Sequence, residues 1–350
     1  MDGVCDVVSL MASTVIYRLG LFGACCKCLG WGRLTVVFYH DVVTTNPLPE
    51  LSLHIEHNLF DEHLSALAKH YHFVGMSELA DHRAMPPRPL VLTFDGYSNT
   101  FLEVAEGLSR KGFKAVFYLQ TEPILCGRPH WRQQVYFLFR QMPAGPFALR
   151  SHGMAFSADL PKDPLGRLRV ARTLANGMEG MSNSHEVVSQ IAEQAEIDLA
   201  DFNRTYRPLT PDETGVLAAL PGIEIGSHSH RHLVLKNLPL AQGRDELQVS
   251  KQLLERWTQQ PIRHYAYPSG QTSNSVLTLL PQLGYKTAVV TGMRRHRLHT
   301  APEWPYLIPR FGIPSRPFVK VAGRLVGIEG ILAKLARLRR RALQDPSHEV

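Results

Sequence analysis

Residues 90–97 read Leu-Val-Leu-Thr-Phe-Asp-Gly-Tyr, and this stretch decides the fold. An apolar run with the length and composition of a buried strand ends in a carboxylate, Asp95, which Gly96 follows at once. This pattern is typical of a residue at the mouth of an α/β domain, where the carboxyl ends of parallel strands converge. We therefore expect Asp95 to lie in a functional site.

A second stretch, residues 226–232, reads Gly-Ser-His-Ser-His-Arg-His and follows a short apolar strand at residues 222–225. Imidazoles four residues apart fall on one side of a helical turn, so His228 and His232 could reach one metal ion together. His230 could do so only in another local geometry. Three histidines in five residues also fit a solvated loop, and this stretch alone leaves both interpretations open.

Apolar periodicity predicts alternating strands and helices along the chain. The predicted strands are residues 34–39, 72–75, 90–95, 114–119, 222–226, 263–267, 286–291 and 307–313. The predicted helices are residues 57–70, 100–111, 187–199, 211–219, 240–258 and 274–283. Alternation at this spacing predicts an α/β fold with a parallel (β/α) barrel. Residues 126–210 depart from this alternation of strands and helices and are interpreted as a helical insertion on the catalytic face.

Composition agrees with one large core, because 44% of the 350 residues are hydrophobic. The net charge of +7 favours anionic partners, such as an anionic membrane surface. The interleaved basic and aromatic residues of an RNA-binding protein are missing, so we expect no nucleic-acid partner. The five cysteines are an odd number and gather near the N-terminus, which matches neither a disulfide framework nor a zinc ribbon.

The two ends of the chain read as separate segments. Residues 1–33 are apolar or amphipathic, with Arg18 the single charge between Val7 and Cys26. They lack the basic start of a signal peptide, so we expect a helix packed on the domain or at a membrane interface, with a signal anchor as the alternative. Residues 319–350 predict a basic amphipathic helix and tail. That helix either docks on the barrel or binds anionic lipid. We expect the protein in the cytoplasm or at the periphery of the cytoplasmic membrane.

Three motifs together resemble those of the polysaccharide deacetylase family, the NodB-homology domain of carbohydrate esterases. They are Thr-Phe-Asp-Gly at 93–96, His-Ser-x-x-His at 228–232 and Tyr-Ala-Tyr-Pro-Ser-Gly at 265–270. The resemblance covers roughly residues 34–315 in the family's order, with further likeness at 37–41, 115–118, 284–288 and 309–310. It implies a distorted parallel (β/α) barrel of the NodB type over residues 34–318, interrupted by the insertion.

The resemblance also implies an activity and its site. The reaction would be metal-dependent removal of N-acetyl or O-acetyl groups from an envelope polysaccharide or lipid-linked glycan, with an N-acetylated glycan as partner. His228, His232 and Asp95 would hold the divalent metal, most plausibly Zn²⁺. Asp95 and His40 would be catalytic. The substrate groove would be lined by Tyr267, Pro268, Ser269 and Gly270.

One departure affects the expected activity. The family's first motif carries two adjacent aspartates, a general base and a metal ligand, whereas this chain has Asp95 alone. If the motif is aligned on the preceding strand residues Thr93 and Phe94, Asp95 matches the first aspartate, the base. If it is aligned on the loop that begins at Gly96, Asp95 matches the second aspartate, the metal ligand. One carboxylate does not readily do both, because coordination lowers its basicity. The alternative is therefore a catalytically weakened, deacetylase-like glycan-binding protein.

The general acid is also open. The family's late Leu-x-His motif is not matched at Leu298-His299. His40, which follows the first predicted strand, is the better placed candidate, although it also fits a hydrogen-bonded strand-end histidine. Other histidines, including His54 and His63, are expected on helix and loop surfaces.

Overall fold

The computed structural model describes residues 11, 13–30, 33–46, 48, 54–181, 183–292, 296–297 and 305–325. Its centre is a closed barrel of parallel strands, and β1 and β5 close it by pairing with each other. In spatial order these strands are β1 (Arg33–Tyr39), β13 (Ile308–Gly312), β11 (Thr287–Thr291), β10 (His264–Ala266), β9 (Ile223–Ser227), β6 (Ala115–Leu119) and β5 (Pro89–Gly96).

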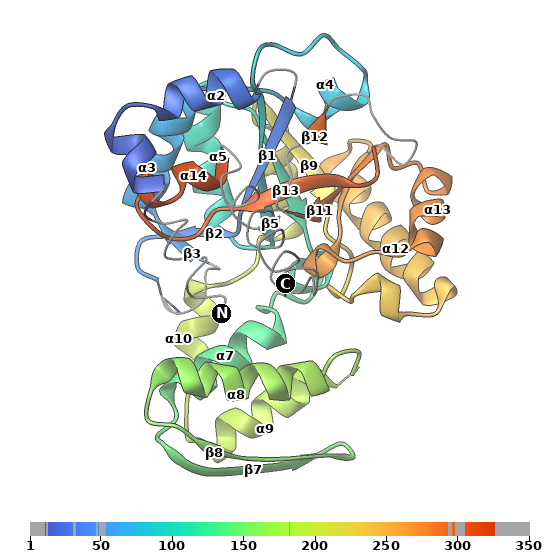
Figure 1. Ribbon diagram of the computed structural model, residues 1–350. Helices are drawn as coiled ribbons and strands as arrows, with labels where there is room; N and C mark the ends of the chain where they lie inside the picture. The colour runs from blue at the N-terminus through green and yellow to red at the C-terminus, as the bar shows by residue number, and fades with distance from the viewer. Residues whose placement is uncertain are drawn as a thin grey trace, which may run out of the picture.

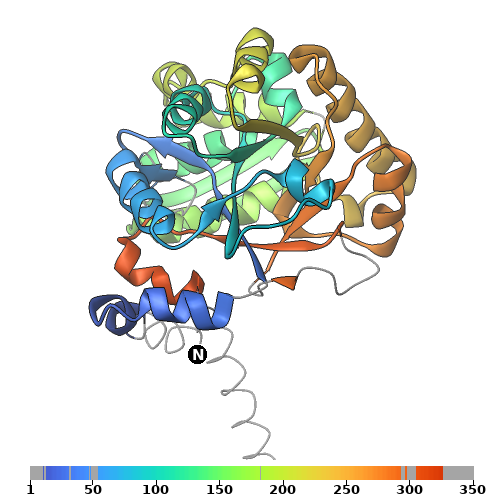
Figure 2. The same ribbon diagram turned by 90° about the horizontal axis from the view of Figure 1, so that it is seen from above.

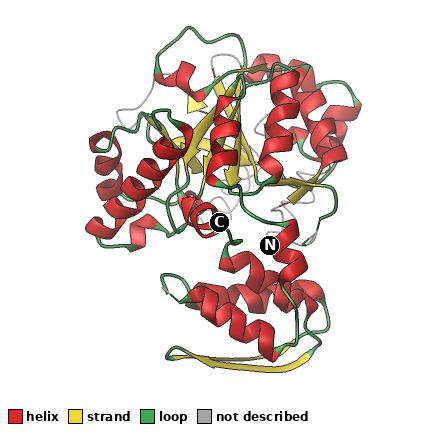
Figure 3. Ribbon diagram, turned by 180° about the vertical axis from the view of Figure 1, so that it is seen from behind, coloured by secondary structure: helices red, strands yellow, loops and turns green. Residues whose placement is uncertain are grey.

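Helices surround the barrel, as Figure 3 shows by the red ribbons around the yellow strands. They are α3 (His57–Ala68), α4 (Met76–Ala80), α5 (Thr100–Arg110), α11 (Pro211–Ala219), α12 (Leu240–Thr258) and α13 (Asn274–Gln282). Two short strands extend the sheet, β4 (His72–Phe73) beside β5 and β12 (His296–Arg297) antiparallel to β1. The prediction of a distorted parallel (β/α) barrel is confirmed. The predicted barrel strands and helices lie within a few residues of the observed ones, whereas α4 and β12 were not predicted.

The barrel strands are buried on both faces, which is why they read as continuous apolar runs. Every residue of β6 is buried, and so are the first seven of β5. The rings of Phe94 and Phe117 stack between these strands with centroids 4.6 Å apart. This packing fixes the ends of β5 and β6, where the polar residues of the site begin.

Between β6 and α11 the chain forms a separate layer, seen below the barrel in Figure 1. After the short helix α6 (Thr121–Cys126), it contains α7 (Trp131–Gln141), β7 (Gly145–Ser151), β8 (Met154–Leu160), α8 (Pro164–Gly177), α9 (Ser184–Gln194) and α10 (Ala200–Thr205). A hydrophobic cluster of its own holds this layer together, with Phe139, Leu149 and Val187 fully or almost fully buried. We call residues 127–205 the inserted layer.

The antiparallel hairpin β7–β8 was not predicted, since the sequence favoured helices alone here. Its burial alternates along β7, with Phe147, Leu149 and Ser151 buried and their neighbours exposed or half-buried. His152 and Gly153 both have positive φ and turn the chain between the strands. The outward positions of β7 include Pro146 and Ala148 beside Arg150, so the sequence does not alternate clearly between apolar and polar residues.

The described N-terminal residues pack against the end of the described chain. Phe22 and Cys26 of α2 (Phe22–Gly30) are buried, and the Phe22 ring lies 5.5 Å from that of Phe318. The Gly323 N–H of α14 (Ala322–Leu325) donates to Ser13 Oγ at 3.1 Å, and Figure 2 shows α2 and α14 side by side. Among the described residues, no helix is long and apolar enough to span a bilayer. The basic helix predicted beyond Leu325 lies outside them.

Candidate active site

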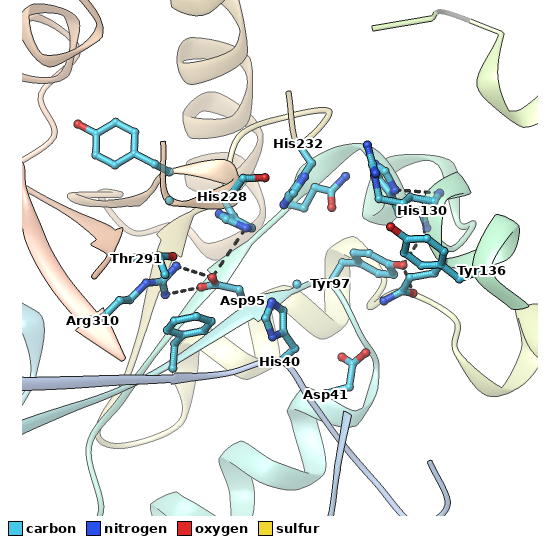
Figure 4. A pocket seen from close by; sticks show the side chains of 18 residues that line it. His40, Asp41, Asp95, Tyr97, His130, Tyr136, His228, His232, Thr291 and Arg310 are labelled. Carbon is cyan, nitrogen blue, oxygen red and sulfur yellow. Dashed lines mark hydrogen bonds and ion pairs between the residues drawn. The ribbon is translucent and has the colours of Figure 1, made fainter. Parts of the chain in front are cut away.

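A cavity of about 320 Å³ opens at the carboxyl ends of the barrel strands. Parallel strands in a closed barrel bring their ends together, so residues far apart in the sequence meet here. The strand-end residues that line it include His40 after β1, Asp95 on β5, Gln120 after β6, His228 after β9, Tyr267 after β10 and Thr291 on β11. Figure 4 shows the labelled side chains around this cavity.

Asp95 lies at the base of the cavity in a buried ion pair with Arg310 of β13. Arg310 Nη1 donates to Asp95 Oδ1 at 2.6 Å, and Nη2 donates to Oδ2. Arg310 is 1% exposed and Asp95 is 4% exposed, and the Arg310 guanidinium lies 4.5 Å from the Phe38 ring. Burial alone would raise the pKa of Asp95, but the charge of Arg310 and its hydrogen bonds hold that pKa below its ordinary value. Asp95 is therefore a charged carboxylate with a fixed orientation.

His228 faces Asp95 across the cavity floor. Its Nδ1 lies 2.9 Å from the Ala266 carbonyl oxygen, which can only accept a hydrogen bond, so Nδ1 carries the proton. The neutral ring then has its lone pair on Nε2, which lies 3.8 Å from Asp95 Oδ2. Burial lowers the pKa of His228 despite the charge of Asp95. Two acceptors thus face each other, an arrangement that suits a water molecule donating to both.

His232 reaches the same cavity through a loop and not through the predicted helical turn. Ser229 and His232 both have positive φ, of 66° and 61°, and the His232 N–H donates to Ser229 Oγ at 2.9 Å. This tight turn brings the rings of His228 and His232 edge to face with centroids 4.8 Å apart. His230 lies 2.9 Å from Thr121 Oγ1 through its Nδ1 and is not a lining residue of the cavity.

The predicted groove segment forms η2 (Pro268–Gly270) directly after β10. Tyr267, Ser269 and Gly270 line the cavity, while Pro268 is buried behind it. Ser269 and Gly270 both adopt left-handed φ, and a side chain at Gly270 would overlap Thr291. The segment is therefore a rigid turn against β11.

The backbone at Gly96 disfavours a second carboxylate directly after Asp95. Gly96 has a φ of 145°, a conformation that side chains other than hydrogen rarely allow. A Cβ atom there would lie 3.3 Å from the Phe101 ring and 3.9 Å from Asp41 Oδ1. Asp41, at the start of β2 (Asp41–Val43), is itself buried and 3.4 Å from His54 Nε2. The space beside Gly96 is thus bordered by a different carboxylate.

The predicted metal ligands fit a metal site only in part. His228 presents a lone pair whose tautomer is fixed by a backbone carbonyl, as metal-binding histidines do. Asp95 fits less well, because each of its carboxylate oxygens already accepts a hydrogen bond from Arg310, whose positive charge opposes a cation bound beside it. Across the described ranges, no group of three histidine, cysteine, aspartate or glutamate side chains is arranged to hold a metal ion. The described donors therefore do not make a complete three-ligand site.

Several cavity residues were not assigned a role from the sequence. Arg310 was noted for its likeness alone, although a cation in the middle of an apolar strand is a signal of a buried partner. Arg132 and Tyr136 come from α7 of the inserted layer and also line a second hollow of about 630 Å³, which reaches Arg172 and Asn176 of α8. The two hollows share Arg132, Tyr136, His232 and Ser269.

Comparisons with known proteins agree with this architecture. The family model described as polysaccharide deacetylase matches residues 82–288. A search of curated proteins found no match. Among solved structures, a Streptococcus pyogenes deacetylase in complex with acetate is similar with a TM-score of 0.52 and 16% identity, over 81% of this chain and 93% of that one.

Two further solved structures share the fold. IcaB from Ammonifex degensii has a TM-score of 0.51 and 14% identity, over 84% of this chain and 97% of that one. A polysaccharide deacetylase from Bacillus cereus has a TM-score of 0.53 and 14% identity, over 84% of this chain and 69% of that one. With the family model spanning more than half of the sequence, the chain belongs to the polysaccharide deacetylase family.

Proposed function

We propose that this protein hydrolyses acetyl groups from an acetylated polysaccharide or lipid-linked glycan, with N-acetyl groups as the preferred target. The observation that carries the proposal is the pairing of Asp95 and His228 at the floor of the cavity, with Arg310 behind them. Amide hydrolysis needs a water molecule that loses a proton as it attacks the carbonyl carbon. This pair supplies the acceptors for that proton.

The geometry orients the water as well as activating it. A water molecule that donates one hydrogen to Asp95 Oδ2 and the other to His228 Nε2 directs its lone pairs into the cavity. Arg310 keeps Asp95 charged and prevents its rotation through two hydrogen bonds. The Ala266 carbonyl prevents His228 from presenting a proton at Nε2. Both acceptors are thus held in the state that binding such a water requires.

His40 is the proposed proton carrier to the leaving group. It lines the cavity, and Figure 4 shows its ring between Asp95 and Asp41. Burial lowers the pKa of His40 below its ordinary value, and the negative charges of Asp95 and Asp41 oppose this only in part, so the ring is neutral and able to accept a proton. A proton taken by His40 is stabilised by these carboxylates and can then pass to the leaving nitrogen or oxygen.

The second hollow supports a glycan longer than one sugar. It continues from the cavity past His232 and Ser269 to α8 of the inserted layer. Its lining combines Tyr136 with amide and charged side chains, namely Arg132, Arg172, Asn176, Glu179, Asn237 and Gln271. Aromatic faces and polar groups together suit the alternating apolar and hydroxyl surfaces of a sugar chain.

Zinc binding by His228 and His232 stays a prediction. The family resemblance implies a divalent metal, which when bound would polarise the carbonyl and acidify a water. Asp95 is paired with Arg310, and the proton transfers proposed for Asp95, His228 and His40 take place between the protein's side chains and the substrate water. Metal analysis of the purified protein, before and after dialysis against a chelator, tests the prediction directly.

A second candidate function is glycan binding with weak or no turnover. The single aspartate of the first motif favours it, and the positive φ of Gly96 disfavours a side chain directly after Asp95. In that case the cavity binds the acetylated sugar and releases it unchanged.

Acetate release separates the two functions. Purified protein is incubated with N-acetylated oligosaccharides and, in parallel, with O-acetylated glycans, and both acetate and free amines are measured. Release of acetate with one amine for each acetate supports de-N-acetylation. Binding without release on either substrate class supports the second candidate and contradicts hydrolysis.

A further inference from the structure

Gln120 occupies the position between the two strands that carry Asp95 and His228. Its backbone N–H donates to the Gly96 carbonyl at 2.9 Å, and the His228 N–H donates to the carbonyl of Leu119 at 2.9 Å. Both flanking strands are therefore tied to the end of β6. The Gln120 side chain starts from this rigid point and lines the cavity.

The side-chain amide of Gln120 has an unmet hydrogen-bonding requirement. The residue is 3% exposed, and its Nε2 is buried without a hydrogen-bond partner. Buried polar groups normally have partners, because leaving a donor unpaired costs free energy. The neighbouring amide in the cavity differs, since Gln133 Oε1 accepts a hydrogen bond from the Tyr97 hydroxyl. Gln120 is thus a lining amide of the cavity with a donor to offer.

We propose that the Gln120 amide donates a hydrogen bond to the carbonyl oxygen of the acetyl group bound in this cavity. The identity of the ligand rests on the proposed function. A half turn about the last side-chain torsion exchanges Oε1 and Nε2, so the amide can turn an N–H toward the cavity. The acetyl carbonyl oxygen supplies the acceptor that the protein does not.

The chemistry of an amide suits this place. A carboxylate here would add a second negative charge near Asp95 and repel the oxygen on which charge develops during attack. The amide is neutral and does not titrate, so its donor is present at every pH at which the protein is folded. A donor aimed at that oxygen strengthens as the charge grows, which makes it worth more in the transition state than in the bound substrate.

Two variants of Gln120 and one matched control test the proposal. Gln120→Met keeps the length of the side chain and removes the donor, and Gln120→Glu keeps the shape but offers an acceptor. The control is Gln134→Met on α7, because Gln134 is also buried, with an unpartnered Oε1, and is not a cavity-lining residue. Thermal melts establish that each variant is folded.

Binding is measured by calorimetry with an N-acetylated chitooligosaccharide and with its fully de-N-acetylated counterpart. We expect the wild type to prefer the acetylated form. Gln120→Met and Gln120→Glu should lose about tenfold in affinity for that form alone, and Gln134→Met should lose nothing. Where acetate is released, kcat should fall about 100-fold in both Gln120 variants, with a smaller change in KM.

The outcomes separate this inference from the proposed function. Acetate release by the wild type with unchanged binding and kcat in both Gln120 variants would overturn the role of Gln120 and leave hydrolysis standing. Selective binding that is lost in Gln120→Met, without acetate release, would support Gln120 and refute hydrolysis. A wild type that binds both oligosaccharides equally would overturn the inference.

Discussion

Replacement of Arg310 by Met should make the stability of the protein strongly pH-dependent. Arg310 is the partner of a carboxylate that is 4% exposed, and both oxygens of Asp95 receive its hydrogen bonds. Removing one member of a buried ion pair leaves an uncompensated charge and costs about 3–5 kcal/mol. We expect a loss of that size in the free energy of unfolding at pH 7.

The loss should shrink in acid, and the sign follows from the two pKa shifts. In the wild type the folded pKa of Asp95 is lowered, so its contribution to stability is present above the unfolded value of about 3.9 and is lost as the pH falls through the folded pKa. In Arg310→Met, burial raises the folded pKa above the unfolded value. Below that folded pKa, Asp95 takes up a proton, and the variant is no longer destabilised by an unpaired buried charge.

Urea unfolding at pH 7 and at pH 4.5 measures the effect. Arg310→Met/Asp95→Asn is the control, because it removes the charge together with its partner and should recover most of the stability at pH 7. A loss below about 1 kcal/mol at pH 7, or an equal loss at both pH values and in the double variant, would refute the buried-charge reasoning.

Three further predictions concern the motif, the histidines and the chain end. Gly96→Asp should lower the free energy of unfolding by about 1–3 kcal/mol without raising acetate release, because the φ of 145° at this position is strained for a side chain. A gain in activity would show that the turn accommodates the second aspartate. His228→Ala/His232→Ala should abolish stoichiometric zinc in metal analysis of the purified protein, and wild-type stoichiometry in this variant would exclude them as ligands. Truncation after Ile328 should weaken binding to anionic vesicles at low salt, since the arginines at 337 and 339–341 would each contribute on the order of 1 kcal/mol. Equal binding by the truncated and the full-length protein would contradict a membrane role for this segment.

The barrel could be predicted because its strands are apolar on both faces and are separated by amphipathic helices. Asp95, His40, His228 and His232 could be placed in one cavity because parallel strand ends converge. The geometry at His232 could not be predicted in the same way. It depends on positive φ at Ser229 and His232, a conformation that is uncommon for residues other than glycine.

The hydrogen-bond and ion-pair partners of the site residues could not be predicted from the sequence either. Arg310 and Asp95 are separated by 215 residues, and only barrel closure brings them together. His54 and His63, expected on the surface, are 3% and 0% exposed. His63 is held by the Tyr39 hydroxyl and the Arg316 carbonyl, contacts that local patterns do not encode.

The most direct test of the account compares acetate release from an N-acetylated oligosaccharide by wild type, Asp95→Asn and Asp41→Asn. Asp41 is the matched control, because it is a buried carboxylate of the same cavity that pairs with His54 and not with Arg310. We predict release by the wild type, a loss of at least about 100-fold in Asp95→Asn, and a smaller loss in Asp41→Asn. Equal rates in wild type and Asp95→Asn, or binding of the oligosaccharide with no release by the wild type, would contradict the account.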